Sequence, residues 1–161
     1  MTENKIKSHG ALVLAALEET RKGRKVGFTN GCFDILHKGH VEYLEKARTL
    51  CDVLIVGVNS DTSVKGLKGN ARPLNAENAR CRVIAGLECV DHVTVFSEDT
   101  PEMLIKKIRP TVLFKGGDWK ESDVAGGEFV KSIGGKVVII PFVEGFSTTA
   151  IINKMKSTEH L

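Results

Sequence analysis

Two histidines, His37 and His40, stand three residues apart, just past an apolar run and at the start of a helical pattern. Residues i and i+3 share one face of a helix. With Gly39 between them, both imidazoles can approach one ligand from the side to which the first-turn N–H groups point, which favours an anion site. A tight strand-to-helix turn with two surface histidines is the alternative. A zinc site is not favoured, because the sequence offers no convincing third ligand.

Arg80 lies on or beside the apolar stripe of its predicted helix, and a guanidinium in such a place needs a partner. The partner is either a carboxylate, such as Asp91 or Glu88, or a bound phosphate, which suits the two-pronged donor geometry of arginine. The stripe is formed by Val83, Ile84 and Leu87.

Three further cations, Lys65, Lys68 and Arg72, fall in the longest segment without a clear pattern, Ser60–Leu74, which also contains two glycines. A loop of this length in a compact domain is usually functional or mobile. These side chains can swing onto a polyphosphate, or they form a solvated basic loop.

Polar and aromatic side chains also follow the later apolar runs. Lys115 precedes two glycines, and Trp119 offers a flat face to a base or a sugar, or serves in packing. Asp118 could accept a hydrogen bond from a sugar hydroxyl, help to hold a metal or cap a turn. Ser147 and Thr148 could bind phosphate through their hydroxyls and the N–H groups of the last helix, since simple N-capping accounts for only one of them.

From about residue 25, continuous apolar runs alternate with helical periodicities, which predicts strands that are covered on both faces. We therefore predict a single doubly wound, Rossmann-like α/β domain with a five-stranded parallel sheet and flanking helices. Residues 8–22 are predicted to form an N-terminal helix. The predicted strands are Lys25–Thr29, Val53–Val58, His92–Phe96, Thr111–Phe114 and Val137–Pro141.

Most of these polar segments come directly after a predicted strand. In doubly wound sheets, ligands bind beyond the carboxyl ends of the strands. Independent segments that meet at this rim predict one common binding site. The segments are residues 29–31, 59–61, 115–119 and 144–149.

The 161 residues suffice for one domain, which we divide into an N-terminal helix (1–24), the main domain (25–156) and a tail (157–161). The net charge of +3 is too small to indicate a nucleic-acid partner. No apolar run approaches the ~20 residues that cross a membrane, and the N-terminus lacks a signal-peptide core. We therefore predict a cytoplasmic protein with no membrane partner.

The segment Gly31–His40, Gly-Cys-Phe-Asp-Ile-Leu-His-Lys-Gly-His, resembles the GxFDxxHxGH signature of the cytidylyltransferase-like nucleotidyltransferases. The closing segment Glu144–Thr149 resembles the second signature of that family. Across residues 25–155 the chain is most similar to the branch that adenylylates D-glycero-β-D-manno-heptose 1-phosphate. The resemblance rests in addition on Val58–Asp61, Leu67–Gly69, Arg72–Asn75 and Lys115–Asp118.

The resemblance implies a reaction of ATP with heptose 1-phosphate that yields ADP-heptose and pyrophosphate, a step toward the lipopolysaccharide inner core, with Mg²⁺ accompanying ATP. It also implies the roles of individual residues. Catalytic roles fall on His37, His40, Lys68 and Arg80. Nucleotide binding falls on Thr29, Asn30, Gly31, Phe33, Gly39, Lys115, Gly117, Asp118, Trp119, Ser147 and Thr148. Binding of the acceptor falls on Asp34, Asn59, Asp61, Lys65 and Arg72. No metal ligand is assigned.

Other functions stay open at this point. They are a cytidylyltransferase for a polyol or amino-alcohol phosphate, an FAD-synthetase-like adenylyltransferase, and a nucleotide sensor without turnover. Relatives that use glycerol 3-phosphate typically carry an arginine where Phe142 stands, which argues against that substrate. The resemblance further implies a possible homodimer and a separate heptose kinase, because 161 residues leave no room for a kinase domain.

Overall fold

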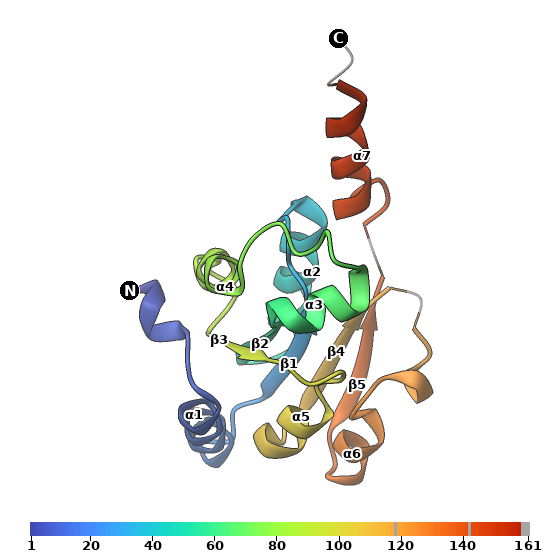
Figure 1. Cartoon of the computed structure of the whole chain (residues 1–161). Coiled ribbons are helices and arrows are strands. Elements are labelled where there is room, and N and C mark those ends of the chain that lie inside the picture. Colours follow the sequence, from blue (N-terminus) through green and yellow to red (C-terminus); the bar gives the residue numbers. More distant parts are fainter. Residues whose placement is uncertain (118, 142, 159–161) are drawn as a thin grey trace.

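The computed structural model describes residues 1–117, 119–141 and 143–158, and Figure 1 shows how its helices and strands alternate. The elements are η1 (Thr2–Lys5), α1 (His9–Arg21), β1 (Val26–Gly31), α2 (Lys38–Arg48), β2 (Val53–Asn59), α3 (Asp61–Lys68), α4 (Glu77–Ala85), β3 (His92–Phe96), α5 (Glu102–Ile108), β4 (Val112–Gly116), η2 (Glu121–Asp123), α6 (Gly127–Ser132), β5 (Lys136–Ile140) and α7 (Thr148–Thr158).

The five strands form one sheet in the order β3-β2-β1-β4-β5, and every neighbouring pair is parallel. Val26 of β1 lies opposite Val53 of β2, while Phe28 lies opposite Leu113 of β4 on the other side. The chain thus starts in the middle of the sheet and winds outward in both directions. This topology confirms the predicted doubly wound fold, and the order of the strands reverses between β1 and β4.

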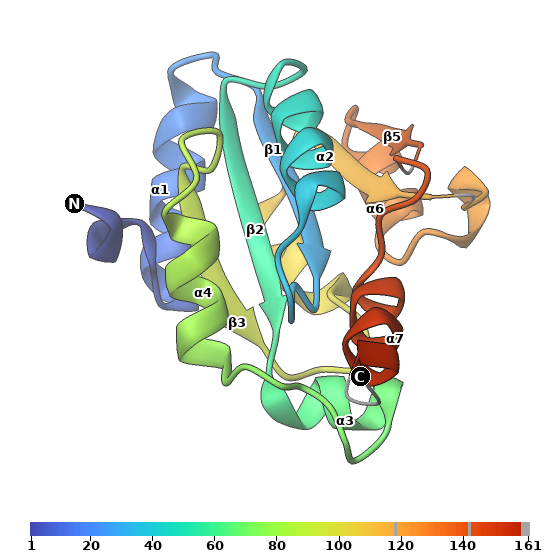
Figure 2. The same cartoon turned by 90° about the horizontal axis from the view of Figure 1, so that it is seen from above.

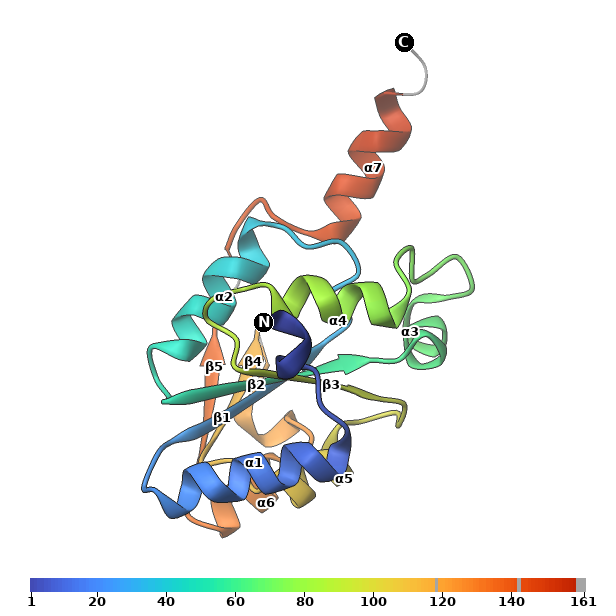
Figure 3. The same cartoon turned by 90° about the vertical axis from the view of Figure 1, so that its left-hand side faces the viewer.

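Two apolar cores, one on each face of the sheet, account for the continuous hydrophobic runs. Along β2, Leu54 and Val56 belong to the core beneath α2 and α4, and Val53 and Ile55 to the core that faces α1, α5 and α6. Figure 3 shows these two helical layers on either side of the sheet. Because side chains alternate along a strand, a strand between two layers must be apolar at every position.

The segment Ser60–Leu74, predicted to be irregular, contains a helix. Ser60 caps α3 through its hydroxyl, which accepts a hydrogen bond from the N–H of Ser63 at 3.2 Å, and Val64 is fully buried. Gly69, with φ of +89°, ends the helix. The glycines in this segment argued against a helix in the sequence analysis. In the structure, capping and the burial of Val64 outweigh the low helix propensity of glycine.

Residues at the N-terminus attach to the outer strand β3. Ile6 forms a parallel bridge with Val93, and the N–H of Lys7 donates to the carbonyl of Val93 at 2.9 Å. The hydroxyl of Thr94 donates to the carbonyl of Lys7 at 2.8 Å. This N-terminal segment, residues 6–7, therefore covers part of an edge that would otherwise expose unpaired backbone groups.

At the other end of the chain, α7 projects from the body of the molecule (Figure 1), and the view in Figure 2 looks along it. No helix within the described residues is long and apolar enough to cross a membrane.

Candidate active site

A cavity of about 650 Å³ lies beyond the carboxyl ends of β1 and β4, a size that is typical of small-molecule sites. It brings together segments that are far apart in the sequence. The predicted site residues that line it are Asn30, Gly31, Phe33, Asp34, His37, Gly39, His40, Lys68, Arg72, Lys115, Trp119, Ser147 and Thr148. The predicted residues that do not line it are Thr29, Asn59, Asp61, Lys65, Arg80 and Gly117, and Asp118 lies outside the described residues.

The rings of His37 and His40 stack on each other in this cavity, with centroids 3.8 Å apart and an interplanar angle of 23°. Phe33 packs edge-on against His40 at 5.2 Å. The Nδ1 atoms of both histidines are buried, and neither has a hydrogen-bond partner among the described residues. Buried polar atoms without a partner are uncommon in folded proteins, and both of these belong to the one histidine pair.

Both imidazoles are neutral at neutral pH. Burial, together with the nearby His37, lowers the pKa of His40 to about 4. Burial also lowers the pKa of His37. A neutral imidazole still carries one N–H and can donate a hydrogen bond to an anion without the cost of a buried charge.

The N-terminus of α2 faces the same site. His37 is its N-cap residue, and the His37 side chain makes no capping hydrogen bond. Gly39 allows the close packing here, because a methyl group at this position would lie 3.1 Å from His37 Nδ1 and 3.3 Å from Phe146 Cβ. A helix N-terminus beside two N–H donors is a favourable place for phosphate.

The closing segment meets the first motif from the opposite side. Ser147 Oγ accepts a hydrogen bond from the N–H of Ala150 at 3.0 Å and so caps α7. Thr148 Oγ1 donates to the carbonyl of Ile35 at 3.4 Å. These bonds confirm the prediction that hydroxyl side chains open the last helix.

Lys115, at the end of β4, is half-buried and lies with its Nζ 5.1 Å from the centre of the Trp119 ring. Burial lowers the pKa of Lys115. No carboxylate forms an ion pair with it in the part of the chain that the structure describes. A half-buried cation of this kind is stabilised when an anion binds in the cavity.

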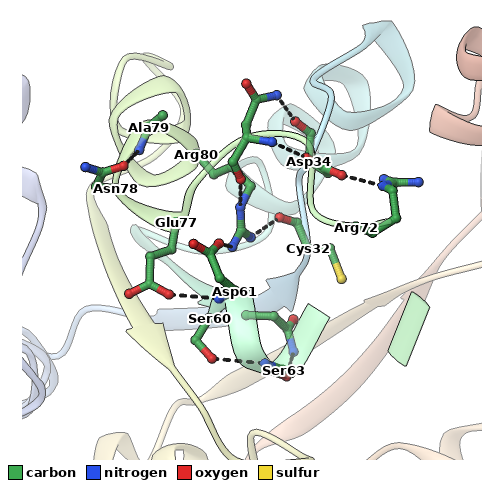
Figure 4. A network of polar contacts seen from close by, with 12 residues as sticks. Cys32, Asp34, Ser60, Asp61, Ser63, Arg72, Glu77, Asn78, Ala79 and Arg80 are labelled. Carbon is green, nitrogen blue, oxygen red and sulfur yellow. Dashed lines mark hydrogen bonds and ion pairs between the residues drawn. The ribbon is translucent and has the colours of Figure 1, made fainter. Parts of the chain in front are cut away.

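Arg80 occupies a different environment from the predicted one (Figure 4). It is 1% exposed, and its guanidinium donates to the carbonyl of Cys32 at 2.6 Å, the carbonyl of Asn75 at 2.9 Å and Oδ1 of Asp61 at 2.8 Å. Its partner is therefore neither Asp91 nor a bound phosphate. The structure does not support a direct catalytic contact for Arg80, because its nitrogens are already engaged within the protein.

The carboxylate of Asp34 is likewise engaged within the protein. It is buried and accepts hydrogen bonds from the N–H groups of Leu74 and Asn75 at 2.8 and 2.9 Å and from Arg72 Nε at 2.5 Å. Burial raises its pKa, but these donors outweigh burial and hold the pKa below its usual value. Direct binding of the acceptor by Asp34 is therefore not supported.

The remaining predicted residues also have partners or places outside the cavity. Asn59 donates to Ser63 Oγ at 2.9 Å, and Thr29 shares a hydrogen bond of 2.7 Å with the hydroxyl of Tyr43. Asp61 pairs with Arg80, and Lys65 is exposed on α3. These positions favour structural roles for Thr29, Asn59 and Asp61.

Tyr43 and Asn75 are among the residues that the sequence-based predictions missed. Tyr43 lines the cavity, and burial raises its pKa to about 12. Its spacing of three residues from His40 on α2 could have revealed it. Asn75 donates from its side chain to the carbonyl of Asp34 at 2.6 Å, a contact across 41 positions that no local pattern signals.

The described residues contain no group of three or more His, Cys, Asp or Glu side chains that could hold a metal ion. Mg²⁺ in nucleotide sites is bound largely by phosphates and water, with few protein ligands. The donor set described here is compatible with a metal that enters with the nucleotide.

Comparison with known proteins places this geometry in context. The profile of the cytidylyltransferase-like family matches residues 28–159. The "Bifunctional protein HldE" of Pelobacter propionicus is 49% identical over 154 residues, and that of Nitratiruptor sp. is 52% identical over 156 residues. These alignments cover 96% and 97% of this chain, which spans about a third (32% and 33%) of each relative's length.

Solved structures share the fold. The lipopolysaccharide core biosynthesis protein from Thermoplasma volcanium superposes with a TM-score of 0.62 at 27% identity and covers 75% of this chain and 98% of its own. The pantoate-beta-alanine ligase from Francisella tularensis superposes with a TM-score of 0.59 at 18% identity, over 96% and 77% of the two chains, which shows the fold alone.

Proposed function

Since this chain belongs to the cytidylyltransferase-like family, we propose that it transfers AMP from ATP to D-glycero-β-D-manno-heptose 1-phosphate. The products are ADP-heptose and pyrophosphate. Two similarities support heptose 1-phosphate as the acceptor. One solved relative is a lipopolysaccharide core biosynthesis protein, and HldE proteins are about 50% identical to this chain. The observation that carries the proposal is the stacked, neutral pair His37 and His40 at the start of α2.

In the proposed reaction, an oxygen of the sugar phosphate attacks the α-phosphorus of ATP. A new P–O bond forms, the bond from the α-phosphorus to the bridging oxygen breaks, and pyrophosphate leaves with that electron pair. Phosphoryl transfer needs little covalent work from the protein, so the main contribution is stabilisation of the charge on the phosphate oxygens. We assign this role to the imidazole N–H groups of His37 and His40.

Other residues hold the two substrates in this scheme. Ser147, Thr148 and the N-terminus of α7 bind phosphate opposite the histidines, and Lys68 adds a cation at the rim of the cavity. Lys115 and Trp119 lie together and bind the nucleotide. Mg²⁺ supplies charge neutralisation of the triphosphate when it is bound.

The proposal is tested by measuring pyrophosphate release from ATP and from CTP with a panel of acceptor phosphates. We expect ATP with heptose 1-phosphate to give the highest kcat/KM. Release with CTP alone would overturn the nucleotide assignment. Absence of release with every pair, while ATP still binds, would identify a nucleotide-binding module without turnover. A separate heptose kinase, a homodimer and a cytoplasmic location stay predictions.

A further inference from the structure

A network of buried polar contacts connects the first motif to the loop that precedes α4 (Figure 4). Its centre is the carboxylate of Asp34, whose side chain is 1% exposed. Both oxygens of this carboxylate receive donors from residues 72–75, and Asn75 returns a hydrogen bond to the carbonyl of Asp34. The loop is therefore fixed to the motif that carries the histidines.

Arg80, on α4, holds the same loop through a second set of hydrogen bonds. Its Nε donates to the carbonyl of Asn75, while the η-nitrogens donate to Cys32 and Asp61. A buried charge is costly unless it is paired and hydrogen-bonded, and removal of one partner leaves the other uncompensated. The network thus holds residues 72–75 in one arrangement. Lys68, at the end of α3, is not part of it.

Arg72 is the cation of this network that faces the cavity. It lines the cavity, and its side chain is 17% exposed. Only its Nε donates to Asp34, and neither η-nitrogen donates a hydrogen bond to any of the described residues. A guanidinium has five N–H donors in a rigid plane, so fixing Nε also fixes the direction of the η-nitrogens.

We propose that Asp34 is a positioning residue, which acts through Arg72 and directs the two η-nitrogens onto a substrate phosphate. The inference rests on the proposed function for the identity of the two candidate phosphates, those of ATP and of heptose 1-phosphate. In this scheme Asp34 contacts no substrate, and its loss matters only as far as Arg72 loses its orientation.

A double-mutant cycle tests this role. The dissociation constants of ATP and of heptose 1-phosphate are measured by calorimetry for the wild type, Asp34→Asn, Arg72→Ala and the double variant, and kcat is measured at saturation. If Asp34→Asn costs Arg72 its orientation and so its charge-assisted hydrogen bond to a substrate phosphate, binding of that substrate should weaken about 10-fold or more. In the Arg72→Ala background the same change should weaken binding less than about 2-fold.

Lys68→Ala provides the matched control, because Lys68 is a cavity cation outside the network. In that background Asp34→Asn should keep its full effect on binding. An equal effect of Asp34→Asn in the Arg72→Ala and Lys68→Ala backgrounds would show a general structural role and overturn the proposal. The substrate whose dissociation constant rises identifies the phosphate that Arg72 holds.

If Asp34→Asn does not fold, Arg72→Lys and Arg72→Ala decide the question. Arg72→Lys keeps the charge next to Asp34 but loses the fixed pair of η-nitrogens, and it should weaken the same substrate as Arg72→Ala. Unchanged affinity for both substrates in these two variants would overturn the proposal. A wild-type protein that binds both substrates without turnover would overturn the proposed function and leave the coupling test intact.

Discussion

The stacked imidazoles of His37 and His40 show how burial can suit a residue to its chemistry. A charged imidazolium would bind ATP more strongly in the ground state as well, which lowers KM without raising kcat. Neutral donors add little to that ground-state attraction, but their hydrogen bonds strengthen as charge develops on the phosphate oxygens. The low pKa of His40, about 4, is therefore part of the proposed function.

We expect His40→Ala to lower kcat by about 10²–10³-fold, since loss of one oxyanion donor costs roughly this factor. The dissociation constant of ATP should change much less. His92→Ala, which alters a histidine on β3 outside the cavity, is the control and should keep kcat. Steady-state kinetics and calorimetry on both variants check this expectation. A large loss of ATP affinity with an unchanged kcat would contradict the assigned role of His40.

The same low pKa predicts a pH dependence of stability. Below its ordinary pKa of 6.5, His40 in the unfolded chain takes up a proton, whereas in the folded chain it stays neutral until about pH 4. The contribution of His40 to the free energy of unfolding should therefore be complete above pH 6.5. It should be lost as the pH falls from 6.5 to about 4, which lowers the free energy of unfolding by on the order of 1–3 kcal/mol. Urea unfolding of the wild type and of His40→Asn measures this term. An equally steep loss in His40→Asn would assign it to other groups.

At the level of elements, the N-terminus of α7 has two roles that one substitution can separate. Ser147→Asp retains an oxygen that can cap the helix, but it adds a negative charge where the proposal places phosphate. We expect stability within about 0.5 kcal/mol of the wild type and a KM for ATP raised about 10-fold or more, because like charges repel at close range.

Ser8→Asp is the matched control for this prediction. Ser8 caps α1 by accepting from the N–H of Ala11, and it does not line the cavity. Ser8→Asp should leave the KM for ATP unchanged. Thermal unfolding and initial rates are measured on both variants, and an equal KM in Ser147→Asp and the wild type would argue against phosphate binding at α7.

The elements that the sequence predicts well are those with local signals. The apolar runs of β1 and β2 end within two residues of the predicted bounds, because both strands are buried on two faces. The helix α3 was missed, since its cap and its buried Val64 are weaker signals than Gly66 and Gly69. Local capping and burial make such a segment helical only when the folded sheet supplies a surface for the helix to pack on.

At the scale of the whole molecule, the positions of Asp34 and Arg80 could not be predicted. Arg80 meets Cys32 across 48 positions, and Asp34 meets Asn75 across 41. The motif drew attention to Asp34, and the apolar stripe drew attention to Arg80. The hydrogen-bond partners of these two residues cannot be predicted from any sequence periodicity. Only the assembled sheet places the loop, the motif and α4 side by side.

A further prediction at this scale concerns the N-terminal segment. Lys7→Pro removes the N–H that donates to Val93, whereas Lys7→Ala keeps it. We expect Lys7→Pro to lower the free energy of unfolding by about 1–2 kcal/mol and to increase aggregation on heating, because more of the β3 edge is exposed. Lys7→Ala should lie within about 0.5 kcal/mol of the wild type. Chemical denaturation and light scattering measure both effects, and equal behaviour of the two variants would contradict this role of the backbone bond.

The contact of Thr148 with Ile35 spans 113 positions and joins the two halves of the cavity. During synthesis, the proposed phosphate site is therefore complete only after the segment that contains Thr148 has left the ribosome. Nucleotide affinity then depends on the folding of residues from β1 to α7. A folding intermediate that lacks α7 would not bind ATP. Because ligands stabilise only states that bind them, ATP would act as a late and selective stabiliser of the finished fold.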